Sequence, residues 1–191
     1  MTIRPITIYG EPVLHKRADE VPEITDEIRT LVADMYETMD AAPGVGLAAP
    51  QVGVGLRIFV YGWEDEDGTV YRGEAINPKL WIAPSIPESF EPVDEHEEVE
   101  GCLSFPGERF PLRRAPAALM EATDIDGNDY RIEATGWFAR ILQHEYDHLD
   151  GVIYVDRLPL PLHKQAGKIM RKQRWGVPGL SWMPGVDNLE G

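Results

Sequence analysis

The chain has 191 residues, of which 43% are hydrophobic, and a formal net charge of -15 at pH 7. This length and composition predict a single globular domain over residues 1–191 that buries its own core, with an irregular tail from about residue 176. The negative charge disfavours binding to DNA or to an anionic membrane.

The chain shows no apolar run of signal-peptide length at its start and no stretch of about twenty apolar residues elsewhere. We therefore expect a cytoplasmic protein. Cys102 is the only cysteine, which excludes an internal disulfide. Its thiol is free, modified or bound to a metal.

The first predicted helix covers residues 25–41. Thr25 suits the N-cap, and Asp26 and Glu27 fall in the first turn, where carboxylates are favourable. The apolar residues recur at helical spacing: Ile28, Leu31, Val32, Met35 and Met39. This pattern predicts an amphipathic helix that packs against the core.

A glycine- and proline-rich stretch, Pro43 to Gln51, follows this helix. Its composition predicts a loop without regular structure and a close approach of the backbone to another group. The Gly-x-Gly within it lacks the other residues of a dinucleotide or phosphate loop, so an ordinary tight loop stays open as an interpretation. The amide of Gln51 can donate a hydrogen bond into a cleft.

Several stretches rich in β-branched and aromatic residues predict a mostly antiparallel sheet. Strands are predicted at 56–63, 69–75, 80–82 and 152–155, with an interruption at Ile76-Asn77-Pro78, and a hairpin joins 117–123 to 129–134 through an Asp-Gly turn. Residues 86–100 are rich in proline and carboxylates, which is typical of a solvated loop, and we expect this for all of its carboxylates except the last, Glu100.

The second long helix is predicted from about Gly136 to Asp150, with Thr135 as its cap and Gly151 as its terminator. It is apolar on several sides, which favours a central, buried position. The predicted fold is therefore α+β, with mostly antiparallel sheets packed around this central helix and with an N-terminal and a C-terminal helix.

The C-terminal helix is predicted over residues 161–175 and carries basic side chains but no acidic ones. The basic residues are Lys164, Lys168, Arg171, Lys172 and Arg174. Both a solvated helix face and a docking surface for RNA or an anionic partner fit this pattern. In the tail, Leu180, Trp182 and Met183 predict a segment that packs back on the domain.

The central helix carries His144 and His148 about one turn apart on one face, which suits the binding of a single metal ion. Glu145 can take a proton from a water that the metal activates. Burying these three groups without partners would be costly, and a divalent cation is a partner for all of them. This pattern indicates metal-assisted hydrolysis.

Two histidines leave a catalytic metal site one ligand short. His15, His96 and His163 lie in segments that look exposed or terminal, so Cys102 is the better third ligand, although a small buried hydrophobe is the alternative reading of that residue. The ligand set by itself favours zinc.

Three segments together resemble the signature motifs of the peptide deformylase family. They are Gly44-Val45-Gly46-Leu47-Ala48-Ala49-Pro50-Gln51, Glu100-Gly101-Cys102-Leu103-Ser104 and Gln143-His144-Glu145-Tyr146-Asp147-His148. The resemblance runs from about Pro5 through the last helix, and the tail from Trp175 to Trp182 is similar to that of actinobacterial members. It implies a hydrolase that removes the N-formyl group from formyl-methionine on newly made polypeptides and releases formate.

The resemblance also implies roles for individual residues. Cys102, His144 and His148 would bind one divalent ion, with Fe2+ expected and Zn2+, Ni2+ or Co2+ able to occupy the same site. Glu145 would be the base, and the Gln51 side chain and Leu103 backbone N–H would stabilise the oxyanion. The expected substrate-binding residues are Val45, Gly46, Glu100, Trp137, Arg140 and Ile141. Glu100 and Asp147 are expected to support the site, with Arg109 or Arg114 paired to one of them.

The substrate class makes the ribosome a candidate partner for the basic helix 161–175. Two other functions are alternatives to deformylation. A short metallopeptidase would need a third ligand downstream of the histidine pair, where this chain has an upstream cysteine instead. A non-catalytic, metal-stabilised binding protein would need neither Glu145 nor Gln51.

Overall fold

The computed structural model describes residues 2–84, 98–187 and 189 and has an α+β fold. The strands are β1 (Ile6–Thr7), β2 (Gly46–Ala48), β3 (Ile58–Glu64), β4 (Val70–Ile82), β5 (Val99–Cys102), β6 (Phe105–Pro111), β7 (Ala117–Thr123), β8 (Asp129–Thr135) and β9 (Ser181–Trp182). The helices are α1 (Asp26–Ala41), α2 (Gly136–Leu149) and α3 (Leu160–Gln173), with short 3-10 turns η1 (Pro12–His15), η2 (Ala49–Val52) and η3 (Tyr154–Arg157). None of the helices in the described ranges is long and apolar enough to cross a membrane.

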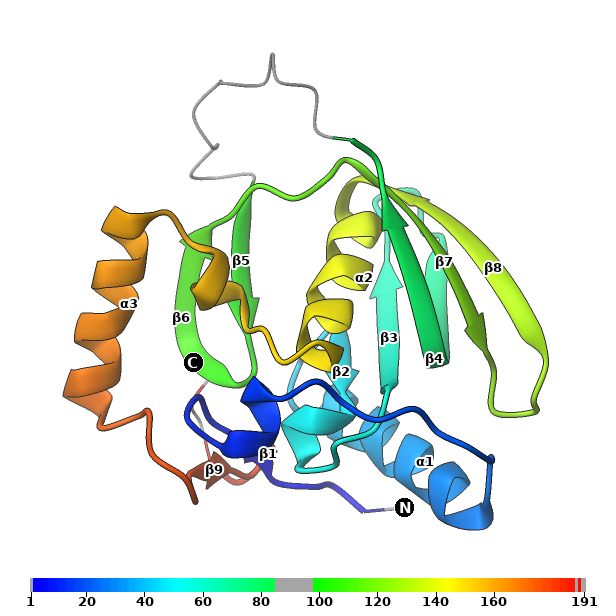
Figure 1. Cartoon of the computed structure of the whole chain (residues 1–191), viewed down its shortest axis with the longest axis horizontal. Coiled ribbons are helices and arrows are strands. Elements are labelled where there is room, and N and C mark those ends of the chain that lie inside the picture. The colour runs from blue at the N-terminus through cyan, green and yellow to red at the C-terminus, as the bar shows by residue number, and fades with distance from the viewer. Residues whose placement is uncertain (1, 85–97, 188, 190–191) are drawn as a thin grey trace.

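The largest sheet has the strand order β2-β3-β4-β7-β8, and each neighbouring pair is antiparallel. Two smaller antiparallel sheets complete the fold, the β5–β6 hairpin and the pairing of β1 with β9. Helix α2 lies between the large sheet and the β5–β6 hairpin, and α3 lies on the outer side of that hairpin (Figure 1). The predicted fold class and the two predicted terminal helices are confirmed.

Helix α2 is central because more than one of its sides is apolar. Phe138, Leu142 and Leu149 pack against the large sheet in one core cluster, where they meet Phe59 and Met120. Burying a side chain of this size stabilises the fold by roughly 1.5–3 kcal/mol. The helix ends as predicted, because Gly151 adopts a left-handed backbone with φ +76°. Thr135 has the extended backbone of an N-cap, although its side chain makes no capping hydrogen bond.

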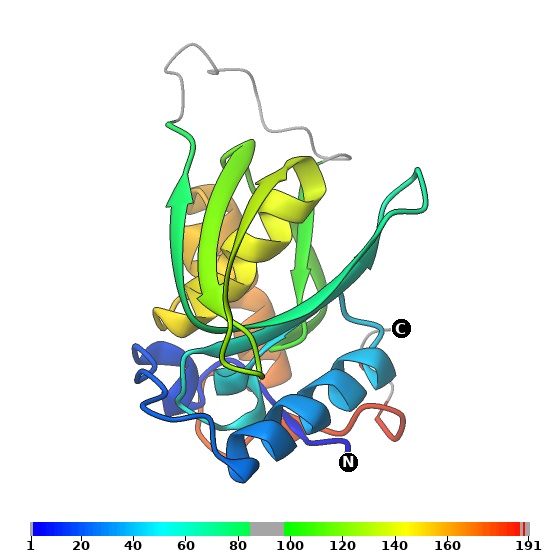
Figure 2. The same cartoon turned by 90° about the vertical axis from the view of Figure 1, so that its right-hand side faces the viewer.

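Helix α1 crosses the other end of the molecule, below the curved sheet in the view of Figure 2. Its stripe of Leu31, Val32, Met35 and Met39 is buried, as predicted. Trp182 of β9 joins the same cluster and pairs with Ile6 of β1, so the tail does pack back on the domain. The N-cap position of α1 falls on Thr25, but here too the side chain makes no capping bond.

Two predictions for the first half of the chain were wrong. The Pro43–Gln51 stretch is not irregular, because Gly46–Ala48 forms edge strand β2 and Ala49–Val52 forms the turn η2. The predicted break at Asn77 is a register shift within one continuous strand, β4. Asn77 takes φ +50° there, and its side-chain amide pairs with both backbone groups of Val21, at 2.8 and 2.9 Å.

The strand predicted at 152–155 was also wrong, because residues 154–157 form the 3-10 turn η3. The Asp156 carboxylate accepts a hydrogen bond from Ile153 N at 3.0 Å, which favours the turn. The apolar pattern of this segment reflects burial instead of a strand. The segment packs in a core cluster with the β5–β6 hairpin through Ile153, Tyr154 and Val155. Most of the predicted solvated loop, residues 85–97, lies outside the described residues.

Candidate active site

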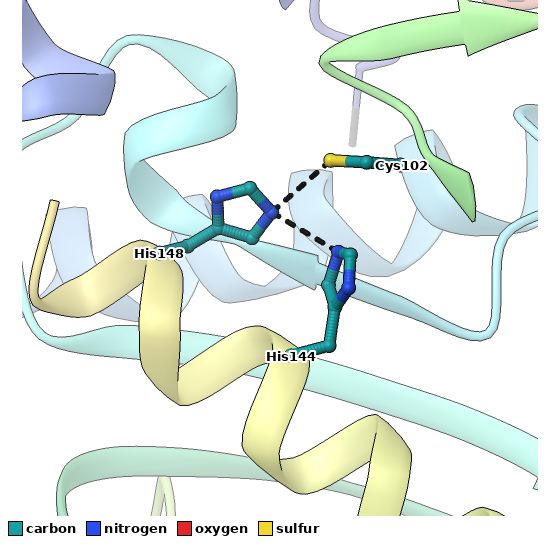
Figure 3. A group of neighbouring side chains, drawn as sticks. All are labelled: Cys102, His144 and His148. Carbon is teal, nitrogen blue, oxygen red and sulfur yellow. Dashed lines mark hydrogen bonds between the residues drawn. The ribbon is translucent and has the colours of Figure 1, made fainter. Parts of the chain in front are cut away.

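The three predicted metal ligands meet between α2 and the β5–β6 hairpin. Their side chains point toward one another, with both imidazoles rising from α2 and Cys102 facing them from the hairpin (Figure 3). Cys102 Sγ lies 3.3 Å from His148 Nε2, which lies 3.2 Å from His144 Nε2. Ligands bonded tetrahedrally at about 2.0–2.3 Å from one ion stand roughly 3.3–3.6 Å apart, so the arrangement fits a metal ion.

This ligand group contains no other histidine from the described ranges. His15 accepts a hydrogen bond from Gly10 N, and His163 Nδ1 contacts the Val155 carbonyl, so each is occupied elsewhere. His96 lies outside the described residues. The sequence favoured Cys102 over the other histidines as the third ligand. The geometry agrees with that choice for His15 and His163.

Burial and the neighbouring positive charge of His144 lower the pKa of His148 well below its ordinary value. A neutral imidazole is the form that binds metal. For His144, burial acts to lower the pKa, but contacts with Cys102 and Glu100 outweigh it and raise the pKa well above the ordinary value. Positive charge is therefore favoured between Cys102 and Glu100, and a bound metal ion would supply it in place of a protonated His144.

Glu100 supports His144 from behind. Its Oε1 lies 2.7 Å from His144 Nδ1, and this contact fixes the ring so that Nε2 faces the other ligands. Arg114 donates to both Glu100 oxygens, at 2.6 and 3.1 Å, and Arg140 Nη1 donates to Oε2 at 3.0 Å. Burial acts to raise the pKa of Glu100, but His144 and Arg114 lower it far below its usual range.

Arg114, and not Arg109, pairs with the supporting carboxylates. It bridges Glu100 and Asp147, both almost fully buried, and Arg157 holds Asp147 from the other side. Arg109 pairs with neither carboxylate in the described structure and instead lines the cavity in front of the ligands. Arg114 therefore pairs with both carboxylates, whereas the sequence predicted a pairing of Arg109 or Arg114 with only one of them.

Glu145 lies next to the ligand group with its carboxylate buried. Its Oε2 has no hydrogen-bond partner among the described residues. Burial raises the pKa of Glu145 to about 7, against the lowering effect of His144. The carboxylate packs directly on Gly46, where any Cβ would overlap Glu145 Oε1. The glycine in the first motif is thus explained by the close approach of β2 to the Glu145 carboxylate.

Gln51 faces the same point from η2. Its Oε1 accepts a hydrogen bond from Ala48 N at 2.8 Å, which orients the amide. Its Nε2 then lies 3.3 Å from Ser104 Oγ and 3.7 Å from Cys102 Sγ. The amide N–H groups are therefore directed at the thiol side of the ligand group, where they can donate to a reacting oxygen.

One cavity is lined by nearly all of the site residues that were predicted from the sequence. Its lining includes Val45, Gly46, Gln51, Glu100, Cys102, Leu103, Trp137, Arg140, Ile141, His144 and Glu145. Of the twelve predicted site residues, only His148 does not line it, because His148 sits behind the other ligands, with 1% of its surface exposed. The guanidinium carbon of Arg140 lies over the Trp137 ring, 5.3 Å from its centre.

Two contacts at the site were not anticipated. Ser104 contacts the Gln51 amide, and the indole N–H of Trp182 donates to the Leu103 carbonyl oxygen at 2.8 Å. The apolar residues of the tail signalled that it packs on the domain, but no local pattern indicates which backbone group Trp182 contacts.

The comparisons with known proteins agree with this geometry. Residues 3–164 match the family model described as polypeptide deformylase. The chain is 50% identical over 187 residues to peptide deformylase 2 of Corynebacterium efficiens, covering 98% of this chain and 96% of that protein. It is 51% identical to the peptide deformylase of Rhodococcus opacus, covering 97% and 95%.

Solved structures resemble the whole fold as well. The Ehrlichia chaffeensis peptide deformylase in complex with actinonin superposes with a TM-score of 0.74 at 35% identity, over 91% of this chain and 99% of that one. The Legionella pneumophila enzyme gives 0.74 at 35% identity, over 90% and 95%. Since the family model matches most of the chain and the Corynebacterium and Rhodococcus relatives are 50–51% identical over nearly all of it, the chain belongs to the polypeptide deformylase family.

Proposed function

We propose that Cys102, His144 and His148 hold a catalytic divalent ion and that Glu145, Gln51 and Leu103 act directly on the formyl group. As a metal-dependent peptide deformylase, the protein removes the N-formyl group from nascent peptides. The observation that carries the assignment of roles is the buried Glu145 carboxylate with one unpartnered oxygen, in the cavity that also contains the ligands Cys102 and His144.

A divalent ion bound by the three ligands supplies a Lewis acid and lowers the pKa of a water in the site. Glu145 takes the proton of the attacking water, whose oxygen forms a bond to the formyl carbon. As the C–N bond breaks, Glu145 returns the proton to the leaving amine, and formate and a free amine result. Burial raises the pKa of Glu145 above that of an ordinary carboxyl, which favours a group that returns the proton it has taken.

Two donors face the oxygen that becomes negative in the transition state. The Gln51 amide is held by Ala48, and the Leu103 N–H belongs to the turn that follows the ligand Cys102. Donors fixed before the reaction stabilise developing charge without reorganising, which is the basis of an oxyanion hole. Each such donor typically contributes about 10²–10³ in kcat.

The methionine side chain of the substrate fits the apolar part of the cavity. Val45, Trp137 and Ile141 supply its walls, and the stem of Arg140 supplies a further apolar surface. The Arg140 guanidinium is held by Glu100 and by the Leu112 carbonyl, at 3.0 and 2.6 Å. We infer that Gly46 presents its backbone to the substrate chain, because it has no side chain to block the approach.

The proposed metal is Fe2+. Imidazole and thiolate ligands accept iron, zinc, nickel and cobalt, so the resemblance to the family is what favours iron. Anaerobic purification followed by elemental analysis tests this, together with activity after reconstitution with each ion. Zinc as the only metal that supports turnover would contradict it.

Because nascent peptides are its substrates, we infer that the enzyme acts in the cytoplasm, near the ribosome. The basic residues Lys164, Lys168, Arg171 and Lys172 of α3 and the C-cap residue Arg174 are all exposed. This face suits contact with ribosomal RNA, whose phosphates attract Lys and Arg in a salt-dependent way. Co-sedimentation with ribosomes should weaken when Lys168, Arg171 and Lys172 are neutralised, and unchanged co-sedimentation would contradict the contact.

The catalytic roles are tested with metal-loaded protein and formyl-Met-Ala-Ser, by measuring formate and free amine. We expect both products from the wild type. Glu145→Ala should keep its metal but lose about 10²–10⁴ in kcat, the usual contribution of a general acid–base group. Full activity of this variant would overturn the role of Glu145, and cleavage between the amino acids instead of formate release would identify a peptidase.

A further inference from the structure

The tip of the β5–β6 hairpin carries two groups of the active site. Cys102 and Phe105 pair across the hairpin, so Leu103 and Ser104 form the turn between them. The thiol of Cys102 and the N–H of Leu103 are consequently adjacent in the chain. Small changes in the turn would move the Leu103 N–H relative to the thiol, because turn residues have few ladder hydrogen bonds of their own.

Both carbonyl groups of this turn are held from outside the hairpin. The Trp182 indole N–H donates to Leu103 O, and Tyr9 N donates to Ser104 O, each at 2.8 Å. The Trp182 side chain is 3% exposed and the contact is buried, so water does not compete for it. The tip is therefore fixed by the C-terminal segment and by the start of the chain.

The two segments that hold the tip also hold each other. Ile6 pairs with Trp182 in the β1–β9 sheet, Ile8 N donates to Leu180 O at 3.0 Å, and Gly176 N donates to Tyr9 O at 2.9 Å. From the side of the cavity, Leu103 packs against Gly44, where an added Cβ would come within 2.9 Å of Leu103 Cδ1. The turn is thus held on two sides.

We propose that Trp182 is a positioning residue for deformylation: its indole N–H fixes the Leu103 carbonyl and so aims the Leu103 N–H at the reacting oxygen. This inference rests on the proposed oxyanion role of Leu103. It assigns a catalytic purpose to the C-terminal segment, of which residues 174–187 and 189, the part that the structure describes, contribute nothing to the lining of the cavity. A group that acts on the transition state should affect kcat more than KM.

The variant that tests this is Trp182→Phe, which keeps an aromatic ring in the core but removes the N–H donor. The matched control is Trp175→Phe in the same segment. Trp175 packs edge-to-face on Phe105 with ring centres 4.9 Å apart, and no hydrogen bond of its indole N–H is seen in the described structure. Both variants lose one indole from the same part of the fold, but only the first loses a bond to the turn.

The measurements are kcat and KM for formyl-Met-Ala-Ser, the visible spectrum of the cobalt-loaded protein, and the denaturation midpoint. For Trp182→Phe we expect kcat to fall by about 10-fold or more, since a displacement near 1 Å can cost about 10²-fold. KM should stay within about twofold and the cobalt spectrum should not change, because the ligands stay in place. Trp175→Phe should keep the wild-type kcat.

Three results would overturn the proposal. They are a folded Trp182→Phe protein with wild-type kcat, an equal fall in kcat for Trp175→Phe, and a changed cobalt spectrum that shows the effect passing through Cys102. If Trp182→Phe does not fold, Trp182→Leu is judged by the same criteria. An inactive wild type would refute the proposed function itself, whereas an active wild type with an insensitive Trp182 refutes only the positioning role.

Discussion

The two halves of the active site are built in different ways. Helix α2 supplies His144, Glu145 and His148 within little more than one helical turn. The opposite half is assembled from β2, η2 and the β5–β6 hairpin, with Gln51 contacting Cys102 across 51 residues of sequence and Trp182 contacting Leu103 across 79. The geometry of the first half follows from helix periodicity, whereas that of the second depends on tertiary packing.

This difference has a consequence for substitutions. On α2 the backbone between the ligands is rigid, so a change at one position leaves the others in place. In the assembled half a single residue often supports several functional groups, as Gln51 does for Cys102 and Ser104. Substitutions there should affect function through position as well as through the loss of a chemical group.

The largest expected effect is at Cys102, the ligand from the assembled half. Cys102→Ala removes the thiolate, and we expect most of the metal and nearly all activity to be lost after desalting. The loss of affinity should exceed the roughly 10- to 100-fold typical of removing a partner that only orients a ligand. Elemental analysis measures it.

The matched control for Cys102→Ala is Glu145→Ala, which lies beside the ligands on α2 but should retain a full complement of metal. Similar metal content in the two variants would contradict the contrast between a ligand and a base.

The next effect concerns the contact between the two halves, at Gly46. Gly46→Ala places a Cβ where the Glu145 carboxylate lies, so this carboxylate, the proposed base, must move. We expect kcat to fall by up to about 10²-fold, since displacements near 1 Å have effects of this size. Steady-state kinetics measures it.

Gly53→Ala is not a suitable control for Gly46→Ala, because φ is +82° at that position. Gly55→Ala is better, because its Cβ would make only an ordinary contact, 3.7 Å from Val13. Wild-type kcat in Gly46→Ala would show that Glu145 does not need this space.

The half of the site on α2 was easier to predict from the sequence than the half assembled from β2, η2 and the β5–β6 hairpin. Helix α2, its burial, the ligand pair and Glu145 were predictable, because periodicity and local spacing determine them. Cys102 was found by elimination and Gln51 by its place in a motif. The turns η2 and η3 were missed, because local hydrogen bonds such as that of Asp156 decide them. The Arg114 bridge and the Trp182 contact could not be predicted, because they depend on how distant segments pack.

A substitution of Arg114 tests the ion pairs that support the ligands, and not the chemistry of the reaction. Arg114→Met removes the arginine that Glu100 and Asp147 share and leaves Arg140 as the arginine partner of Glu100 and Arg157 as that of Asp147, so we expect a loss of up to roughly 3–5 kcal/mol in the free energy of unfolding. In a protein of this size that corresponds to a fall of about 6–20 °C in Tm. Calorimetry at a fixed metal content measures it.

The adjacent Arg113 provides the control. Its pair with Glu98 is more exposed, with 33% and 21% of the two side chains accessible, so Arg113→Met should lose only about 0–1 kcal/mol. Equal destabilisation by the two substitutions would contradict a special role for the buried bridge.

The smallest expected effect is at Tyr9, whose backbone N–H holds the hairpin tip. Its hydroxyl donates to Asp156 Oδ1 at 2.9 Å, and burial and the charge of Asp156 raise the pKa of Tyr9 from 10.0 to about 12. Because the pKa is higher in the folded state, the stabilisation is complete below pH 10 and is lost as the pH rises toward 12. Solvent screening limits it to about 1 kcal/mol. Tyr9→Phe should thus be less stable than the wild type at pH 8, and the difference should shrink by pH 12. A difference that stays constant over this range would show that the hydroxyl contributes nothing through its ionisation.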